Sequence, residues 1–148
     1  MSKRGRLSHA FTCRVRDTCL CLHVQRAARA LARRFDEALR PLALTQGQFS
    51  LLMSLNRPQP PSIGEVSTLL AMDRTTVTAN VKPLERRGLV KVRVDREDRR
   101  NRRLGLTPAG QALLAAAAPI WQRAHAATER RLRSSSPDIL RASLHDLY

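Results

Sequence analysis

The chain has 148 residues and carries 27 Lys and Arg against 12 Asp and Glu, which gives a formal net charge of +15. A hydrophobic content of 43% is too high for a disordered basic tail and is sufficient for one core. Aromatic residues make up only 3%, so we expect an aliphatic, Ala-rich and mainly helical core. The charge favours a polyanionic partner, with nucleic acid ahead of an anionic membrane surface.

Several classes of protein are disfavoured by the same sequence. The sequence contains no run of about 18 apolar residues, so we expect no transmembrane helix. Arg14, Arg16 and Asp17 interrupt the apolar stretch that a signal peptide would need. An odd number of cysteines does not predict a disulfide framework, so we expect a reducing, cytoplasmic setting and no membrane partner. Neither a Gly-rich phosphate loop nor a convincing catalytic or metal motif is present, so we expect no enzyme, cofactor or metal.

The first half of the chain predicts a series of helices with recognisable starts. Residues 1–17 form a basic lead in which we expect little order, and an apolar stripe of helical period then runs until Pro41. Two capping boxes, Thr45–Gln48 and Ser62–Glu65, predict the starts of two short helices. Asp73 is the predicted N-cap of a third, which Gly88 ends.

The hydrophobic period changes from 3.6 to 2 after Gly88. Alternating residues over 90–94 and 104–106 flank the charged segment 95–102, which predicts a β-hairpin with a charged tip. Thr107 and Pro108 then predict the start of a long helix, kinked at Pro119, and a last helix follows Ser136. The terminal helices have more apolar surface than a small central domain can cover, which favours an interlocked symmetric dimer over a compact monomer.

Two short helices followed by a hairpin predict a winged helix-turn-helix, in which the second helix enters the DNA major groove. Arg, Asn and Thr side chains can read base edges, and Lys and Arg can bind phosphates. Any one of these residues alone is more simply a solvated side chain, but the set lies directly before an Arg-rich hairpin. The candidate DNA-contacting residues of the helix are Arg74, Thr75, Thr76, Thr78, Asn80, Lys82 and Arg86, with Arg87 as a further phosphate contact.

Residues 73–110 resemble the recognition helix and wing of the MarR (multiple antibiotic resistance regulator) family. The most specific part is the pattern D-x-x-D-R-R-x-x-x-L-x-L-T-P-x-G at 95–110, which follows L-E-R-R-G-L-V at 84–90. The order of predicted helices extends the resemblance to about residues 18–147, with Pro83 inside the recognition helix as a departure. The implied fold is mainly α, a winged helix-turn-helix with long terminal dimerisation helices and a two-stranded β wing.

The resemblance implies a homodimer that binds an inverted-repeat operator in double-stranded DNA. Residues 45–106 would form the DNA-binding domain, and residues 18–44 and 107–148 the dimerisation region. Arg100 would insert into the minor groove and Asp98 would orient it. Arg96, Arg99, Arg102 and Arg103 would contact phosphates or remain solvated.

The resemblance also implies a regulator, a repressor released by a small-molecule effector or by an oxidant. A pocket for a small aromatic effector would be lined by Arg16, His23, Phe35, Phe49 and Met53, although such Phe and Met are more often plain core. Cys13, Cys19 and Cys21 are candidate redox sensors, because family members that sense oxidants use a Cys near the start of the first helix. Buried apolar Cys residues and a Cys-x-Cys-x-His metal site remain alternatives, although one helix cannot direct residues 19, 21 and 23 at one ion.

The positive charge is divided between two regions. Residues 1–40 and residues 74–103 each carry a net charge of +7. The second region coincides with the predicted recognition helix and wing, whereas the family resemblance does not account for the first. We therefore expect the lead, with Lys3, Arg4 and Arg6, to act as an additional DNA-contacting arm. A nucleoid-type protein that binds DNA without sequence preference is the main alternative function, and a winged-helix RNA-binding protein is a weaker one.

Overall fold

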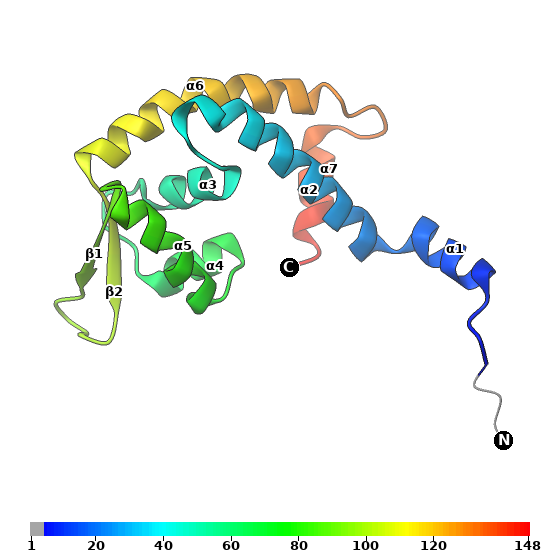
Figure 1. Cartoon of the computed structure of the whole chain (residues 1–148), viewed down its shortest axis with the longest axis horizontal. Coiled ribbons are helices and arrows are strands. Elements are labelled where there is room, and N and C mark those ends of the chain that lie inside the picture. Colours follow the sequence, from blue (N-terminus) through cyan, green and yellow to red (C-terminus); the bar gives the residue numbers. More distant parts are fainter. Residues whose placement is uncertain (1–4) are drawn as a thin grey trace.

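A computed structural model describes residues 5–148, which form a mainly helical protein with one two-stranded sheet (Figure 1). The sequence prediction of a mainly α fold with a two-stranded β wing is confirmed. In chain order the elements are α1 (His9–Thr18), α2 (Leu20–Leu39), the 3₁₀ helix η1 (Arg40–Leu42), α3 (Gln46–Leu55), α4 (Ile63–Leu70), α5 (Arg74–Arg86), β1 (Val90–Val94), β2 (Arg102–Leu106), α6 (Pro108–Glu129) and α7 (Pro137–His145).

The helix starts predicted from the sequence are confirmed by their capping hydrogen bonds. Thr45 and Ser62 each accept the backbone N–H three residues ahead, and the Gln48 and Glu65 side chains accept the N–H of the capping residue in return. Asp73 caps α5, Thr107 caps α6 and Ser136 caps α7 through their side-chain oxygens. These bonds satisfy backbone amides that have no partner within their helix, so local sequence fixes where each helix begins.

The wing is an antiparallel hairpin of β1 and β2, in which Val90 pairs with Leu106 and Val94 with Arg102. A further bridge joins Ser62 to Arg103, and the Leu104 N–H donates to the Pro61 carbonyl at 2.9 Å. The segment before α4 therefore continues the sheet beyond β2. This pairing fixes the wing to the start of the helix-turn-helix.

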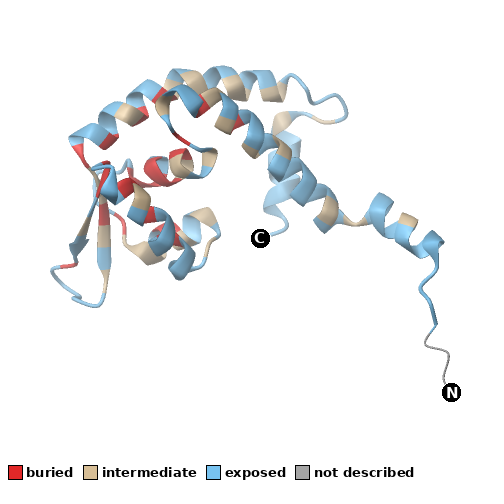
Figure 2. Ribbon diagram, in the orientation of Figure 1, coloured by how far each residue is buried: buried red, intermediate tan, exposed pale blue. Residues whose placement is uncertain are grey.

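The core lies in the winged-helix unit, where Figure 2 shows the buried segments gathered in α3, α5 and the base of the hairpin. Side chains from every element from α2 to α6 meet there, and Leu39, Leu52, Leu84 and Leu104 have no exposed surface. Aliphatic residues dominate this core, as the low aromatic content predicts. Burial of this kind contributes about 25 cal/mol per Å² and holds α5 and the wing in one rigid arrangement.

The basic lead differs from the sequence prediction. Ser8 caps a helix, α1, over His9–Thr18, where little order was expected before residue 18. No residue of α1 is buried, and the helix extends away from the winged-helix unit (Figure 1). Cys19 interrupts the helical path with extended backbone angles before α2 begins. A helix with little tertiary contact leaves no core-facing stripe in the sequence, which explains the miss.

A surface ion pair joins the last two helices. Arg141 of α7 contacts Glu129, the last residue of α6, at 2.8 Å, and it also pairs with Asp138 of its own helix at 2.6 Å. Ile139, Leu144 and Leu147 nevertheless stay exposed, as do Leu20 and Leu31 of α2. Within residues 5–148 no helix is long and apolar enough to cross a membrane.

Candidate nucleic-acid interface

The exposed face of α5 carries a single row of small and basic side chains. Val77, Val81 and Leu84 are buried, which fixes the rotation of the helix. Because each residue advances the helix by about 100°, the opposite face presents residues at spacings of four, three and four. Those residues are Thr75, Ala79, Lys82 and Arg86, all exposed. Three of them were predicted, whereas Ala79, at the centre of the row, was missed because alanine has no polar group to draw attention.

Two of the predicted threonines already use their hydroxyl protons inside the helix. The Thr76 hydroxyl donates to the Asp73 carboxylate at 2.7 Å, and the Thr78 hydroxyl donates to the Arg74 carbonyl at 2.8 Å. The bond from Thr76 also lowers the pKa of Asp73 below its ordinary value. Since phosphate oxygens only accept hydrogen bonds, these hydroxyls fit apolar contact through their methyl groups better than phosphate binding.

Arg74 lies across the start of α4. A Cβ atom placed on Gly64 would come within 2.9 Å of the Arg74 Nη2 atom, so the guanidinium rests on α4 where a side chain is missing. Arg74 lines a shallow groove together with Arg57 and with Thr68 and other residues of α4. The small residue at position 64 therefore helps to set where this guanidinium lies.

Asn80 lies to one side of the exposed row. Its amide Nδ2 is 3.9 Å from the Met72 sulfur, and the residue lines a cavity of about 210 Å³ with Thr45, Gln48 and others from α3 and α5. Asn80 therefore lies on the flank of α5 that borders α3, although the residue is exposed, and its role in reading a base stays a prediction.

The tip of the wing is held by hydrogen bonds to its own backbone. Asp98 accepts the Arg100 backbone N–H at 3.0 Å and the Asn101 amide Nδ2 at 3.3 Å. Asp98 thus contacts Arg100 through the backbone N–H, and its expected effect on the orientation of the Arg100 side chain stays a prediction. The side chains of Arg96, Arg99 and Arg100 are exposed.

Arg103 occupies the base of the wing and faces inward, unlike the other arginines there. Its Nε donates to Asp95 at 2.5 Å, and its Nη1 donates to Glu65 at 3.2 Å and to the Pro60 carbonyl at 3.4 Å. Of the two expectations for this residue, a phosphate contact or a solvated side chain, neither describes the structure, in which the guanidinium is engaged by two carboxylates. A phosphate contact of Arg103 stays a prediction.

Asp95 was not singled out from the sequence, although it organises the whole loop. It is buried and accepts the backbone N–H groups of Glu97 at 2.8 Å and Asp98 at 3.3 Å. These backbone donors, followed by the Arg103 side chain, lower the pKa of the Asp95 carboxyl. Arg103 and Asp95 together connect the wing to α4 through the contact of Arg103 with Glu65.

Arg87 also has an internal role. Its Nη1 donates to the Ala43 carbonyl at 2.8 Å and its Nη2 to the Leu42 carbonyl at 3.5 Å. These bonds form a clasp between the end of α5 and the turn that follows α2, while Arg87 itself remains exposed, so its phosphate contact stays a prediction. The local sequence gives no sign of this long-range contact, because Arg87 and its neighbour Arg86 are chemically identical.

The residues proposed to line an effector pocket are not brought together within the described part of one chain. Arg16 pairs with Asp17 at 2.6 Å, Phe49 stacks on Trp121 at a centroid distance of 6.1 Å, and Met53 is 45% exposed. Phe35 is buried in the core, and only His23 of the five borders the cavity described below. Phe35 and Phe49 are buried within one chain, and their part in an effector pocket stays a prediction.

The three cysteines lie on or between the first two helices, and all are free thiols. Cys13 lies 3.7 Å from the His9 Nε2 atom, Cys19 separates α1 from α2, and the Cys21 sulfur accepts a bond from Gln25 at 3.4 Å. His23 is bonded to the Cys19 carbonyl at 2.8 Å. Across residues 5–148, no three His, Cys, Asp or Glu side chains gather in a way that could hold a metal ion.

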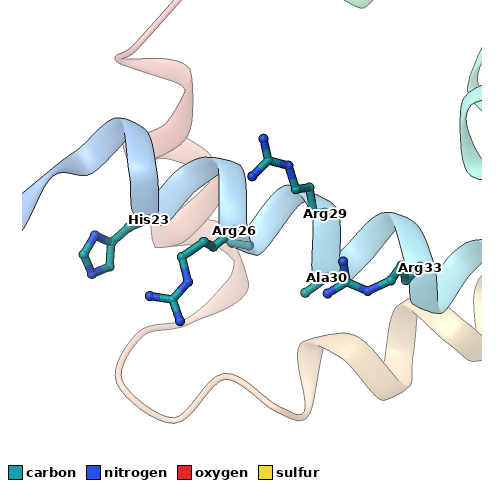
Figure 3. Close-up of a pocket in the computed structure, with 6 residues that line it drawn as sticks. His23, Arg26, Arg29, Ala30 and Arg33 are labelled. Carbon is teal, nitrogen blue, oxygen red and sulfur yellow. The ribbon is translucent and has the colours of Figure 1, made fainter. Parts of the chain in front are cut away.

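A second basic surface runs along α2. His23, Arg26, Arg29 and Arg33 project from one side of the helix and border an open cavity of about 530 Å³ (Figure 3). The buried residues Phe35 and Leu39 lie on the opposite side. We call these four residues the α2 basic stripe. Of the arm predicted before it, Arg6 is exposed, whereas Lys3 and Arg4 lie outside the described residues.

The three-helix unit α3–α5 with its hairpin defines a winged helix-turn-helix protein whose exposed recognition face is basic. Residues 44–101 match the MarR family. The Mycobacterium tuberculosis transcriptional regulator MosR, solved in complex with DNA, is 33% identical, with a TM-score of 0.80 over 88% of this chain and 93% of MosR. The chain belongs to the MarR family.

Two other relatives extend the comparison. The regulator TtmR of Methylorubrum extorquens is 34% identical over 66% of this chain, but the match spans only 50% of TtmR. This chain therefore spans about half the length of that curated relative. Bordetella bronchiseptica BpsR, whose DNA binding is regulated by 6-hydroxynicotinic acid, is 25% identical, with a TM-score of 0.76 over 88% of this chain and 98% of BpsR.

Proposed function

We propose that the protein is a homodimeric transcriptional regulator that binds an inverted-repeat operator in double-stranded DNA. The observation that carries the proposal is the outer row of α5, with Thr75, Lys82 and Arg86 exposed beside a wing whose tip presents Arg100. A helix with this row fits the major groove, and a guanidinium at the wing tip suits the negative potential of a narrow minor groove. The DNA complex of MosR supports the same mode of binding.

Sequence-specific binding is tested by selecting operators from a random duplex library with the purified chain. We expect one enriched inverted repeat whose half-sites are separated by about one helical turn. A library without an enriched motif, together with equal affinity for scrambled duplexes, would indicate the nucleoid-type protein instead.

The role of the wing tip is tested with Arg100→Ala. Loss of a minor-groove contact should weaken operator binding by about 1–3 kcal/mol while leaving the oligomeric state unchanged. Arg133→Ala, which removes an exposed arginine after α6, is the control and should leave affinity unaltered. Titration by gel shift measures both variants, and equal affinities for Arg100→Ala and the unmodified protein would exclude the proposed contact.

For regulation, we propose repression that is relieved by a small aromatic acid or by cysteine oxidation. The regulation of BpsR by 6-hydroxynicotinic acid supports the first signal, and the free thiols of Cys13, Cys19 and Cys21 support the second. Release of the selected operator is measured with aromatic acids and separately with peroxide. The triple Cys→Ser variant should lose only the peroxide response, and release of this variant by peroxide would contradict the redox proposal.

A further inference from the structure

The α2 basic stripe is not explained by the recognition helix, the wing or the folded core. Its three arginines are exposed, and among the described residues none of them lies within ion-pair distance of a carboxylate. By contrast, Arg40, which directly follows α2, pairs with Glu37. Adjacent guanidinium groups at spacings of three and four residues repel one another. A row left without counter-charge is therefore suited to an external anion.

The stripe lies on the side of α2 that a partner chain would leave free. The exposed apolar residues of this helix, Leu20, Val24 and Leu31, share the side of the buried Phe35 and Leu39. A second copy of the chain would cover that apolar side to remove it from water. By helical spacing, Arg26, Arg29 and Arg33 lie on the other side of the helix. Figure 3 shows their side chains around the cavity.

The shape of this surface favours a polymer over a small ligand. Small-molecule sites are enclosed and mostly apolar, whereas this cavity is open and its lining comes from one helix, with Ala27 and Ala30 as its only apolar side chains. From His23 to Arg33 the helix rises about 15 Å, a length over which B-DNA carries about nine phosphate charges. Arginine matches phosphate oxygens through paired N–H donors.

We infer that Arg26, Arg29 and Arg33 form a second, sequence-independent contact with the backbone of double-stranded DNA. This inference rests on the proposed function and adds a contact made by the dimerisation region. It accounts for part of the positive charge that lies within residues 1–40. Contacts to phosphates add affinity and salt dependence but carry no sequence information.

The test compares two triple variants of the intact chain on one duplex that carries the selected operator and flanking sequence. Arg26→Gln/Arg29→Gln/Arg33→Gln removes the charge, and Arg26→Lys/Arg29→Lys/Arg33→Lys keeps it. The Gln variant should bind about tenfold more weakly at physiological salt, and its log–log salt slope should be shallower by about 0.9 for each phosphate that is no longer neutralised. The Lys variant should retain most of the slope, and both should prefer the operator over a scrambled duplex by the same ratio as the unmodified protein.

A charge-matched control removes the same net charge elsewhere. Arg130→Gln/Arg131→Gln/Arg133→Gln changes three arginines at the end of α6 and should leave the slope unchanged. The inference is overturned if the stripe variant keeps the original slope, or if the control lowers it equally. It is also overturned if the stripe variant keeps the slope but no longer releases DNA on addition of an aromatic acid, which would make the stripe an effector site.

Failure of the inference and failure of the proposed function give different results. In the first case the unmodified protein still selects an operator and only the slopes of the variants coincide. In the second case the unmodified protein selects no operator at all. Circular dichroism and sedimentation of each variant establish that fold and oligomeric state are intact.

Discussion

At the scale of single residues, chemically identical side chains in the hairpin have opposite roles. Arg100 is exposed at the wing tip, whereas Arg103 is bonded to Asp95 and Glu65 at its base. The difference follows from register: Arg103 pairs with Arg93 in the sheet and bridges Ser62, which places it beside the start of α4. Arg103 thus helps to hold the loop in place, and Arg100 is exposed at the tip of that loop.

Removing Arg103 should therefore loosen the wing without removing a DNA contact. In Arg103→Ala, the backbone amides of Glu97 and Asp98 should exchange about tenfold faster, because Asp95 loses a partner that holds it under the loop. The affinity of this variant for the operator should also fall, because the wing tip is less firmly positioned. Arg99→Ala is the matched control, since its side chain is exposed, and its loop amides should exchange at the original rate. Unchanged exchange in Arg103→Ala would remove the anchoring role.

Asp95 predicts a pH dependence with a definite sign. Hydrogen bonds from the Glu97 backbone N–H and from Arg103 lower its pKa below the ordinary value of 3.8, so its stabilising effect is fully present above that value. It is lost as the pH falls through the lower pKa of the folded state. Asp95→Asn should therefore be less stable than the unmodified protein at pH 7, and denaturant titrations should show this difference shrinking as the pH drops below about 4. A constant difference across this range would contradict the assignment.

The sequence predicts the roles of these residues only where a local pattern determines whether a side chain is exposed. The α5 and wing candidates were found from their spacing and from the family resemblance, and Thr75, Lys82, Arg86 and Arg100 are exposed where expected. The contacts of Arg87 with Ala43 and of Arg103 with Glu65 join residues that are 44 and 38 positions apart in the chain. No periodicity carries that information, because it arises only when the elements pack.

At the scale of elements, the junction of α5, β1 and α6 is held by an unusually close approach of backbone to backbone. The side-chain hydroxyl of Thr107 donates to the Gly88 carbonyl at 2.5 Å and accepts the Gly110 backbone N–H at 3.0 Å. A Cβ atom on Gly110 would overlap the Leu89 carbonyl oxygen. The first turn of α6 can approach the end of α5 this closely only because residue 110 has no side chain.

Gly110→Ala should therefore destabilise the fold although alanine favours helices. Overpacking at this contact should cost about 1–3 kcal/mol in the free energy of unfolding, measured by urea titration. Gly47→Ala is the matched control, because a Cβ there meets only the Thr45 hydroxyl at 4.0 Å in the first turn of α3. That variant should be neutral or stabilised by up to about 1 kcal/mol. Equal effects of the two substitutions would argue against a steric cause.

Helix and strand positions were predictable because short-range chemistry fixes them. Capping residues determine where α3 to α7 begin, and alternation of valines determines β1. The helix α1 was not predicted, because its residues contact no core and so carry no core-facing pattern. Prediction of elements thus succeeded where a core-facing pattern accompanies the cap, and it failed for α1, which has the Ser8 cap but no buried face.

At the scale of the whole molecule, the terminal helices leave apolar surface uncovered within the described chain. Ile139 is 62% exposed, Leu147 59% and Leu144 37%. Ile139→Glu/Leu144→Glu should shift the proposed dimer to monomer in sedimentation experiments, because charge burial opposes association. Leu69→Glu on α4, 64% exposed, is the control and should remain dimeric. A double variant with unaltered mass would place the dimer contact elsewhere.

The clasp of Arg87 on the Ala43 and Leu42 carbonyls has a mechanical consequence. These bonds cross the short connection after α2, which consists of η1 and the left-handed Ala43, and so link the end of α2 to the end of α5. In the proposed dimer, we expect the distance between the two recognition helices to depend on the angle between the two α2 helices. A displacement at α2 of about one or two ångströms should then change that distance, and the half-sites of a rigid duplex tolerate little such change.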